Sequence, residues 1–437
     1  SLNESFGSST YWGVNRNGKW FKLRVSLMNA ADYKVPSDTF LYQTTVLPIY
    51  NNRLKNTALD EVAVNAYFGI SKNWGYWYTR VSYFTQKSGF FSGAFGVPSV
   101  GLLRHDGDYN NIDLPFQEVN HLNISSHGNI LIKGNWLEID AGFQQNNRGE
   151  VAKPHSGAFG TEESANNQAL QLQLNTATLN ARYFLNDTNS KKILGFSSQW
   201  RNNVIDGYEF IIPAYNTGMV ALYGLRKSQT KKGWKVNIGG RVELNYLDFD
   251  STKTPFYQQG ELIGAVLRNE AYTTTVPIWA FGIGLNKELK KSFFLKVNTA
   301  KTSRMVQPNE LASNGLHHGA FRFEKGDINL KPETALQNDV SLIYERKRWL
   351  IETSLYGNYF FNFVYLTPSN KFARLEVDGD VYPYPEAGQL YTYTQAPARH
   401  YGFETSLEYK LLSDLIIYTT SEYTEVFNLE SSEYAPF

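Results

Sequence analysis

The sequence predicts an all-β protein that forms a large transmembrane antiparallel β-barrel. Residues 234–246 (WKVNIGGRVELNY) alternate between apolar and polar side chains, interrupted only where Gly240 falls on the apolar side. Strand side chains alternate between two faces, so this stretch is one strand with an apolar and a polar face. Its thirteen residues span roughly 43 Å, which exceeds the usual soluble strand and is enough to cross a bilayer.

Composition favours a barrel over membrane helices. Aromatic residues make up 15% of the chain, yet its mean hydropathy is −0.40 and no run of 18 apolar residues occurs. Helical membrane spans need such runs and are excluded. Strands that are apolar on one face only give this average, and Tyr and Trp are the residues that collect at membrane interfaces.

The expected connections differ sharply in length. Residues 227–232 and 286–292 are predicted to be short turns, whereas 247–275, 301–335 and 366–399 are predicted to be long loops. Outer-membrane barrels have short turns at one rim and long loops at the other, while compact soluble domains seldom carry several long loops. No repeat of 20 to 50 residues recurs, which disfavours a solenoid or a propeller.

Period-two alternation predicts about fifteen strands. In residues 234–246, Val242 is expected to meet lipid and Arg241 the lumen, together with Lys235 and Glu243, because Arg or Lys at mid-membrane costs about 2 to 4 kcal/mol on the lipid face. The expected strand ranges are 20–27, 62–70, 76–84, 131–143, 169–184, 193–200, 219–225, 234–246, 277–287, 293–300, 336–346, 349–363, 401–411 and 415–426.

Charge and residue content exclude several classes of function. The net charge of +1 gives no basis for a nucleic-acid surface. The chain has no Cys, which removes thiolate metal sites, disulfides and thiol nucleophiles and is compatible with an oxidising periplasm. No Ser, His and acid set, no Gly-x-Ser-x-Gly motif and no phosphate loop stands out, so an enzyme is not expected.

One segment carries the motifs of a known family. Residues 304–333 read RMVQPNELASNGLHHGAFRFEKGDINLKPE, and this segment resembles a late barrel loop and the start of the next strand in TonB-dependent outer-membrane receptors. Residues 112–117 with His121, and residues 31–34, are also similar to that family. The positions that match are Arg304, Pro308, Glu310, Leu311, Gly315, His317, Phe323, Glu324, Gly326, Asp327, Leu330, Lys331 and Glu333.

The resemblance implies a barrel of about 22 strands in the outer membrane of a Gram-negative bacterium, filled by an N-terminal plug domain. Residues 1–437 are expected to be a barrel domain throughout. The plug and the closing strands are therefore expected to be absent from this chain, which would supply about fifteen of the strands.

Receptors of this family bind a scarce ligand at the outer face and import it when an inner-membrane TonB complex pulls the plug. The resemblance therefore implies import of a metal ion or metal chelate, such as zinc, a ferric siderophore or haem. Outer-membrane lipid, the plug and the TonB complex are the implied partners, and no cofactor is required beyond the zinc or iron chelate that is transported. The alternatives are a barrel that binds or scaffolds another surface protein, and an importer of a glycan, a peptide or cobalamin. An open diffusion porin is disfavoured.

Two adjacent histidines, His317 and His318, are the candidate metal ligands. Glu310 lies seven residues before His317 and Glu324 seven residues after it. Imidazole nitrogens and carboxylate oxygens suit Zn²⁺ or another transition metal. Adjacent side chains on an extended chain point opposite ways, so only one histidine is expected to reach a given ion. The alternative is a hydrogen-bonded loop histidine.

Two arginines complete the candidate ligand-binding set. Arg304 and Arg322 could attract the carboxylates of a ferric siderophore or of haem, because a guanidinium group pairs with both oxygens of a carboxylate. They could equally pair with Glu310 or Glu324. A weaker candidate set lies on other long loops, where a charged loop surface is the alternative: His105, Asp106, Asp108 and His155.

Overall fold

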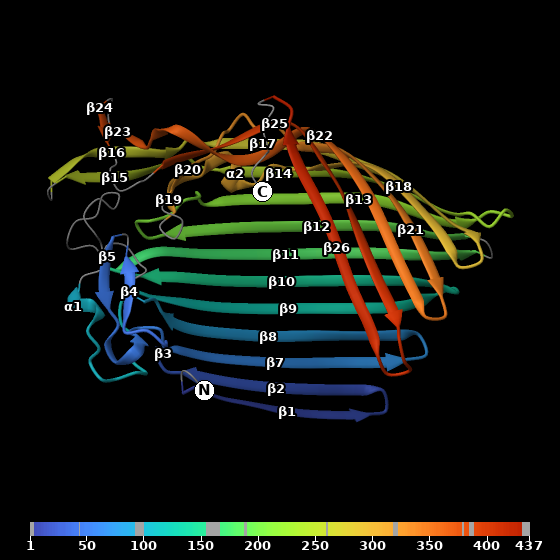
Figure 1. The fold of residues 1–437 in the computed structure, drawn as a ribbon, viewed down its shortest axis with the longest axis horizontal. Coiled ribbons are helices and arrows are strands. Elements are labelled where there is room, and N and C mark those ends of the chain that lie inside the picture. Colours follow the sequence, from blue (N-terminus) through green and yellow to red (C-terminus); the bar gives the residue numbers. More distant parts are fainter. Residues whose placement is uncertain are drawn as a thin grey trace.

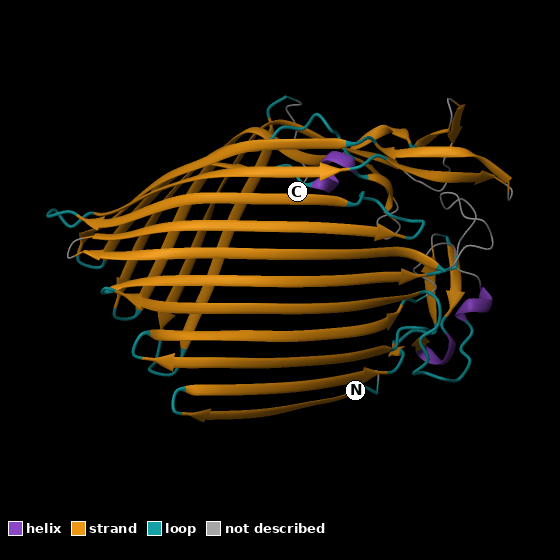
Figure 2. Cartoon of the chain, turned by 180° about the vertical axis from the view of Figure 1, so that it is seen from behind, coloured by secondary structure: helices purple, strands orange, loops and turns teal. Residues whose placement is uncertain are grey.

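The long antiparallel strands form one curved wall (Figures 1 and 2). The computed structural model describes residues 4–42, 44–91, 100–153, 167–187, 190–258, 261–317, 322–377, 380–383 and 389–430. In Figure 1 the long strands between residues 6 and 249 run across the view, and the last three long strands of the chain cross steeply in front of the lower ones. The predicted antiparallel barrel fold is therefore confirmed.

In the described residues the main sheet has 18 strands, of which β19 and β20 are short. Each long strand pairs antiparallel with the next long strand along the chain. The long strands are β1 (Phe6–Arg16), β2 (Lys19–Ala30), β7 (Leu59–Lys72), β8 (Gly75–Gly89), β9 (Phe116–Ile132), β10 (Asn135–Val151), β11 (Gln168–Asp187), β12 (Ser190–Asp206), β13 (Tyr215–Gln229), β14 (Lys235–Phe249), β17 (Tyr272–Lys290), β18 (Phe293–Arg304), β21 (Glu333–Arg346), β22 (Trp349–Phe372), β25 (Gln389–Lys410) and β26 (Ile416–Asn428).

The two rims of the wall differ as the sequence predicts. Tight turns close one rim: Asn17 and Gly18 have φ of 53° and 75°, and Lys133 and Gly134 have φ of 48° and 82°. Two successive positive φ values match the right-handed twist of a hairpin. The long connections lie at the other rim, on the left of Figure 1. They hold β3 (Tyr33–Lys34), β4 (Thr39–Tyr42), β5 (Thr45–Pro48), η1 (Tyr50–Asn52), β6 (Arg53–Leu54), α1 (Val100–Leu103), β15 (Thr252–Gln258), β16 (Glu261–Asn269), α2 (Pro308–Ala312), β19 (Asn314–His317), β20 (Arg322–Lys325), β23 (Arg374–Val377) and β24 (Asp380–Pro383).

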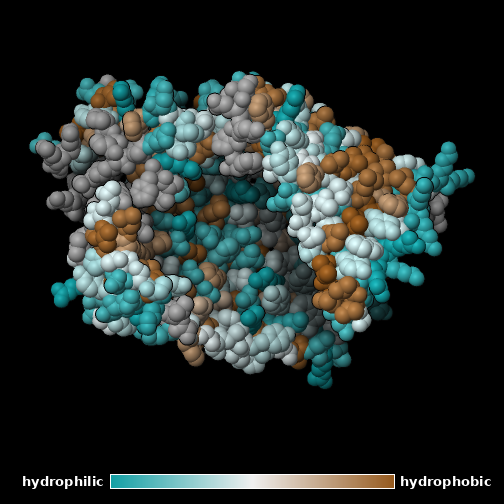
Figure 3. Space-filling view, viewed as in Figure 1, coloured by the Kyte–Doolittle hydropathy of each residue, from teal (hydrophilic) through white to brown (hydrophobic). Residues whose placement is uncertain are grey.

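The wall is apolar outside and polar inside. On β14, Val242 is 60% exposed and Leu244 is 52% exposed. The alternate residues Arg241 and Glu243 are half-buried and bonded to each other, with Nε 2.8 Å from Oε2. Figure 3 shows a hollow whose visible wall is largely hydrophilic. This arrangement is the reverse of a soluble protein, and it matches a strand with lipid on one side and water on the other.

The buried core lies at the rim of the long connections, where residues of β14 and β22 pack with residues of the connections. One buried cluster joins Leu247, Phe249, Val306, Leu311, Ala312, Leu330 and Val364, and a second joins Val266, Leu316, Phe323, Ala373, Leu375 and Val377. These clusters fix the loops against one another at the rim. In the described part of the chain, no helix is long and apolar enough to cross a membrane.

Three expectations about strand limits were wrong. The predicted strand 131–143 spans a turn, because β9 ends at Ile132 and β10 begins at Asn135. The predicted loop 366–399 is in large part strand, since β22 continues to Phe372 and β25 begins at Gln389. Strand β1 was not predicted at all. Its sequence FGSSTYWGVNR mixes small and polar residues with aromatic ones, so its alternation is weak.

Candidate functional site

The connection between β18 and β21 folds over the rim as α2 followed by the β19–β20 hairpin. Helix α2 begins with Pro308 at its first turn, and the backbone N–H of Gln307 donates to Oε2 of Glu310 at 2.7 Å. This reciprocal capping satisfies backbone donors that a helix start otherwise leaves unpaired. The sequence therefore specifies where the chain leaves β18 and begins α2.

A cluster of three charges fastens α2 to the wall. Both oxygens of Glu310 accept from Arg304, each at 2.9 Å. Arg304 also donates from Nε to Glu333 at 3.1 Å, and Glu333 in turn accepts from the backbone N–H of Val364 at 2.8 Å. Of the predicted ligand-binding residues, Arg304 and Glu310 are thus engaged with each other, as the alternative reading of Arg304 allowed.

The β19–β20 hairpin has two chemically different faces. In its pairing, His317 lies opposite Arg322, and Leu316 lies opposite Phe323. Leu316 and Phe323 belong to a buried cluster, so His317, Arg322 and Glu324 share the other face. Arg322 donates from Nε to Oε1 of Glu324 at 2.8 Å. Three of the six predicted site residues are therefore brought together.

A cavity of about 490 Å³ lies beside that face. Its wall includes Ser313, which is 2% exposed and whose Oγ has no hydrogen-bond partner among the described residues. A buried hydroxyl without a partner is costly, so a bound group that hydrogen-bonds to it is favoured. The cavity is lined by Phe90, Arg148, Glu150, Leu170, Leu172, Glu209, Ile211, Ile212, Asn309, Ser313, Leu316, His317 and Glu324.

Sequence reasoning missed the lining residues on β10. The predicted strand 131–143 ends too early, because β10 continues to Val151 and carries Arg148 and Glu150 to the cavity. Arg148 donates from Nε to Oε1 of Gln117 at 3.0 Å and forms an ion pair with Glu150. Residues 145–151 are polar on both faces, so their alternation does not predict a strand.

The predicted metal ligands are only partly described. His318 lies outside the described residues, and His317 is an exposed residue at the end of β19. Glu310 is held by Arg304 and Glu324 by Arg322, so the two acidic residues expected beside His317 already have cationic partners. Metal binding by His317 and His318 stays a prediction.

The weaker loop set contains a buried pair. Nε2 of His105 lies 2.8 Å from Oδ2 of Asp32, and both side chains are 1% exposed. His105 is therefore not part of a charged loop surface. The backbone N–H of Asp108 donates to Asp106 at 3.0 Å and lowers the pKa of that carboxyl. His155 lies outside the described residues.

A wall that is apolar outside and polar inside, with structured loops around a cavity at one rim, defines an outer-membrane barrel of the receptor type. The family described as "TonB dependent receptor-like, beta-barrel" matches residues 5–435, and the chain belongs to that family. Proteins of this family are outer-membrane receptors and transporters, not enzymes.

Solved structures with this fold include three receptors. The copper transporter OprC superposes with a TM-score of 0.69 at 11% identity, over 99% of this chain and 61% of that one. The Serratia marcescens hemophore receptor HasR, in complex with its hemophore HasA and heme, gives 0.62 at 11% identity, over 97% and 62%. The siderophore receptor PirA from Pseudomonas aeruginosa gives 0.61 at 10% identity, over 98% and 64%. At such identities the likeness shows the fold alone, and the chain spans about three fifths of the length of these proteins.

Proposed function

We propose that this barrel belongs to a TonB-dependent receptor that imports a scarce nutrient across the outer membrane, and that the nutrient is a metal ion or a metal chelate. Membership of the receptor family supports import, and the three solved structures named above handle copper, heme and a siderophore. The observation that carries the proposal is the cavity at the loop rim, with Ser313 in its wall, whose Oγ has no partner in the described part of the chain.

The chemistry of the cavity favours a chelate over a bare ion. Its volume of about 490 Å³ is that of a small-molecule site. Two of the three carboxylates that line the cavity are paired, Glu150 with Arg148 and Glu324 with Arg322, so these two do not supply the charge that a naked cation needs. A chelate instead brings its own ligands to the metal. Arg148 uses Nε for Gln117 and Nη2 for Glu150, so its Nη1 can contact the outer oxygens of the chelate together with His317. Leu170, Leu172 and Ile211 can contact its apolar parts.

The energy source and the partners in this proposal are those of the family. A plug domain in the lumen and the inner-membrane TonB complex would drive release, with outer-membrane lipid around the apolar face. Zinc, a ferric siderophore and haem are the ligands to test first, followed by glycans, peptides and cobalamin.

One observation favours a second function, binding of a surface protein. Strands β15, β16, β23 and β24 form a separate four-stranded sheet among the long connections. Leu262 on this sheet is 61% exposed and Val381 is 59% exposed. Apolar side chains on an outer sheet suit a protein contact, which would serve a scaffolding barrel as well as a receptor that takes its ligand from a carrier protein.

Binding to the full-length receptor in detergent tests the proposal. Calorimetry with zinc, a ferric siderophore and haem is expected to find one ligand of the loop cavity, and His317→Ala and Arg148→Gln are each expected to weaken its binding at least tenfold. Lys325→Gln is the matched control, because Lys325 pairs with Asn314 on the opposite face of the β19–β20 hairpin. Wild-type affinity in both cavity variants would overturn the site, and no affinity for any of these ligands would overturn the ligand class.

A further inference from the structure

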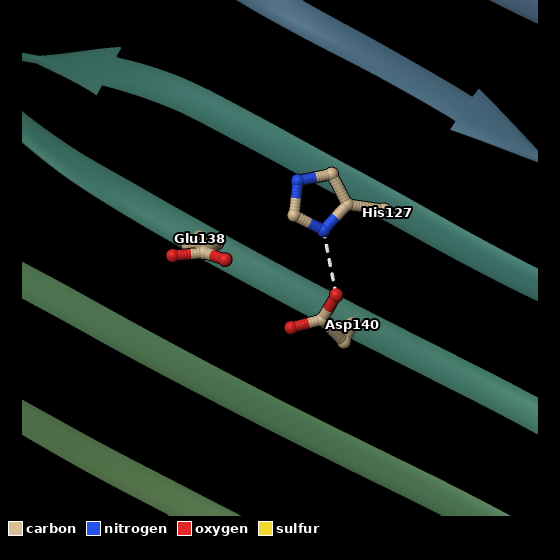
Figure 4. Close-up of side chains that lie close together, drawn as sticks. All are labelled: His127, Glu138 and Asp140. Carbon is tan, nitrogen blue, oxygen red and sulfur yellow. Dashed lines mark hydrogen bonds and ion pairs between the residues drawn. The ribbon is translucent and has the colours of Figure 1, made fainter. Parts of the chain in front are cut away.

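A second group of metal-ligating side chains lies on the inner wall, away from the loop cavity. In the described part of the chain, His127, Glu138 and Asp140 are the group whose ligand atoms all lie within 4.8 Å of one another. His127 is on β9 and lies opposite Asp140 on β10, while Glu138 is two residues away on the same face (Figure 4). The group lies close to the turn at Lys133 and Gly134, at the rim opposite the long connections.

The histidine is held in a fixed orientation by two partners. Its Nδ1 lies 2.6 Å from Oδ1 of Asp140, and its Nε2 lies 3.1 Å from the hydroxyl of Tyr76. The rings of Tyr76 and Tyr78 pack against the imidazole, with centroids 5.5 and 5.3 Å away. A ligating histidine is usually oriented in this way by a group on its second nitrogen.

One arginine neutralises this group only in part. Nη2 of Arg182 lies 2.8 Å from Oε1 of Glu138 and 2.5 Å from Oδ2 of Asp140. A single guanidinium against two carboxylates leaves one formal negative charge, and these residues make no other ion pair with an arginine or lysine in the described part of the chain. The Arg182 side chain is 37% exposed, so it can turn into lumen water when a divalent cation takes its place.

An unsatisfied acceptor lies beside the same group. Asn129 follows His127 by two residues on the same face of β9, and it lies opposite Glu138 on one side and Tyr76 on the other. Its Oδ1 is buried and receives no hydrogen bond from any residue that the structure describes. Carbonyl oxygens are metal ligands, so Asn129 can supply the fourth ligand that a transition metal takes with one imidazole and two carboxylates.

We propose that His127, Glu138, Asp140 and Asn129 form a binding site for a divalent transition-metal ion on the lumen wall. On binding, the metal takes Nδ1 of His127, and the proton on Nδ1 moves to Nε2, which then donates to the hydroxyl of Tyr76. Arg182 leaves the two carboxylates. The site is separate from the loop cavity and does not depend on which ligand the receptor imports.

Zinc titration of the full-length receptor in detergent tests this site. The wild-type protein is expected to bind one ion with a micromolar Kd, and Co²⁺ in its place is expected to give visible d–d absorption with imidazole ligation. His127→Ala and Asp140→Asn are each expected to weaken binding at least tenfold. Arg182→Gln is expected to tighten it at least threefold, because the competing cation is removed. If these residues formed only a structural hydrogen-bond network, Arg182→Gln would not tighten zinc binding.

The matched control is His121→Ala, on the same face of β9, where His121 bonds to Asn146 and has no carboxylate partner in the described residues. Heat-modifiable gel mobility checks that every variant is folded. Unchanged binding in His127→Ala, or no binding by the wild type up to millimolar zinc, would overturn the site. Binding by Arg182→Gln alone would also overturn it as a native site. Zinc bound at the inner wall is expected to be lost in His127→Ala and kept in His317→Ala, whereas a ligand of the loop cavity is expected to show the reverse pattern, so the two proposals fail separately.

Discussion

Arg304 and Glu310 form a two-pronged ion pair, in which Nη1 lies 2.9 Å from Oε2 and Nη2 lies 2.9 Å from Oε1. The pair joins the last residue of β18 to the first turn of α2, and Glu333 at the start of β21 shares the same guanidinium. Three elements that meet at the rim are therefore held by one side chain. The loop that carries His317 and Glu324 to the cavity depends on this junction.

Arg304→Gln is expected to loosen that loop. The side chains of Glu310 and Glu333 are 12% and 11% exposed, so both would keep a largely buried charge without a cation. The arginine itself is 39% exposed, which screens part of the loss, and the expected cost is about 1 to 3 kcal/mol. Hydrogen exchange of residues 308–317 should rise, while that of β10 should not. Lys331→Gln is the control, because Lys331 is an exposed residue in the same connection. Equal hydrogen exchange in the two variants would show that Arg304 does not hold the loop in place.

The inward and outward faces of β14 predict opposite tolerances. Val242→Arg places a charge among exposed apolar side chains and is expected to cost about 2 to 4 kcal/mol at mid-membrane. Arg241→Val removes one half-buried ion pair with Glu243 on the polar face, and this loss is expected to destabilise the barrel less than Val242→Arg does. Assembly yields judged by heat-modifiable gel mobility should fall sharply for Val242→Arg only. Similar yields for the two variants would show that the register is wrong.

The contact between His105 and Asp32 joins two loops, so breaking it is expected to loosen both of them. The backbone N–H of Gly107 donates to Nδ1 of His105, so Nε2 carries the proton that His105 donates to Asp32. His105→Ala would leave a buried carboxylate oxygen without its donor, at an expected cost of about 3 kcal/mol to the packing of these loops. Limited proteolysis should then cut residues 100–115 faster.

His105→Gln is the rescue variant for that pair, because an amide N–H can still donate to Asp32. Partial recovery of protease resistance in His105→Gln, but not in His105→Ala, is the expected pattern. The same cleavage rate for wild type and His105→Ala would show that the pair does not hold the loops.

Alternation of apolar and polar residues predicted most of the wall strands, because each strand shows this period of two within its own sequence. The range 234–246 falls almost wholly within β14, and its two faces are as expected. Contacts between distant segments could not be predicted in this way. Asp32 and His105 lie 73 residues apart, and Arg304 and Glu333 lie 29 apart. Such pairs depend on how loops fold over the rim, which no local pattern encodes.

The group around His127 on the inner wall was missed because one strand limit was predicted wrongly. The predicted strand 131–143 ran through the turn at Lys133 and Gly134, so β9 was not recognised and His127 had no expected neighbours. Counting back from that turn places His127 opposite Asp140. The signal was therefore present in the sequence, but Lys-Gly is a weaker hairpin signal than Asn-Gly or Asp-Gly.

Gly195 predicts a steric effect inside the wall. It lies opposite Tyr223 on the neighbouring strand, and a Cβ at Gly195 would come within 2.0 Å of Cζ of the tyrosine ring. Gly195→Ala must therefore push the ring aside, at an expected cost of about 1 to 3 kcal/mol. Gly357→Ala is the matched control, since a Cβ at Gly357 has no atom within 4 Å among the described residues. Urea unfolding in lipid vesicles should separate the two variants, because only Gly195→Ala displaces Tyr223 and the Arg241 guanidinium 5.7 Å from its ring centre. Equal urea midpoints for the two variants would show that the Tyr223 ring moves without a cost in free energy. Packing of this ring over Gly195 would then not contribute to the stability of the wall.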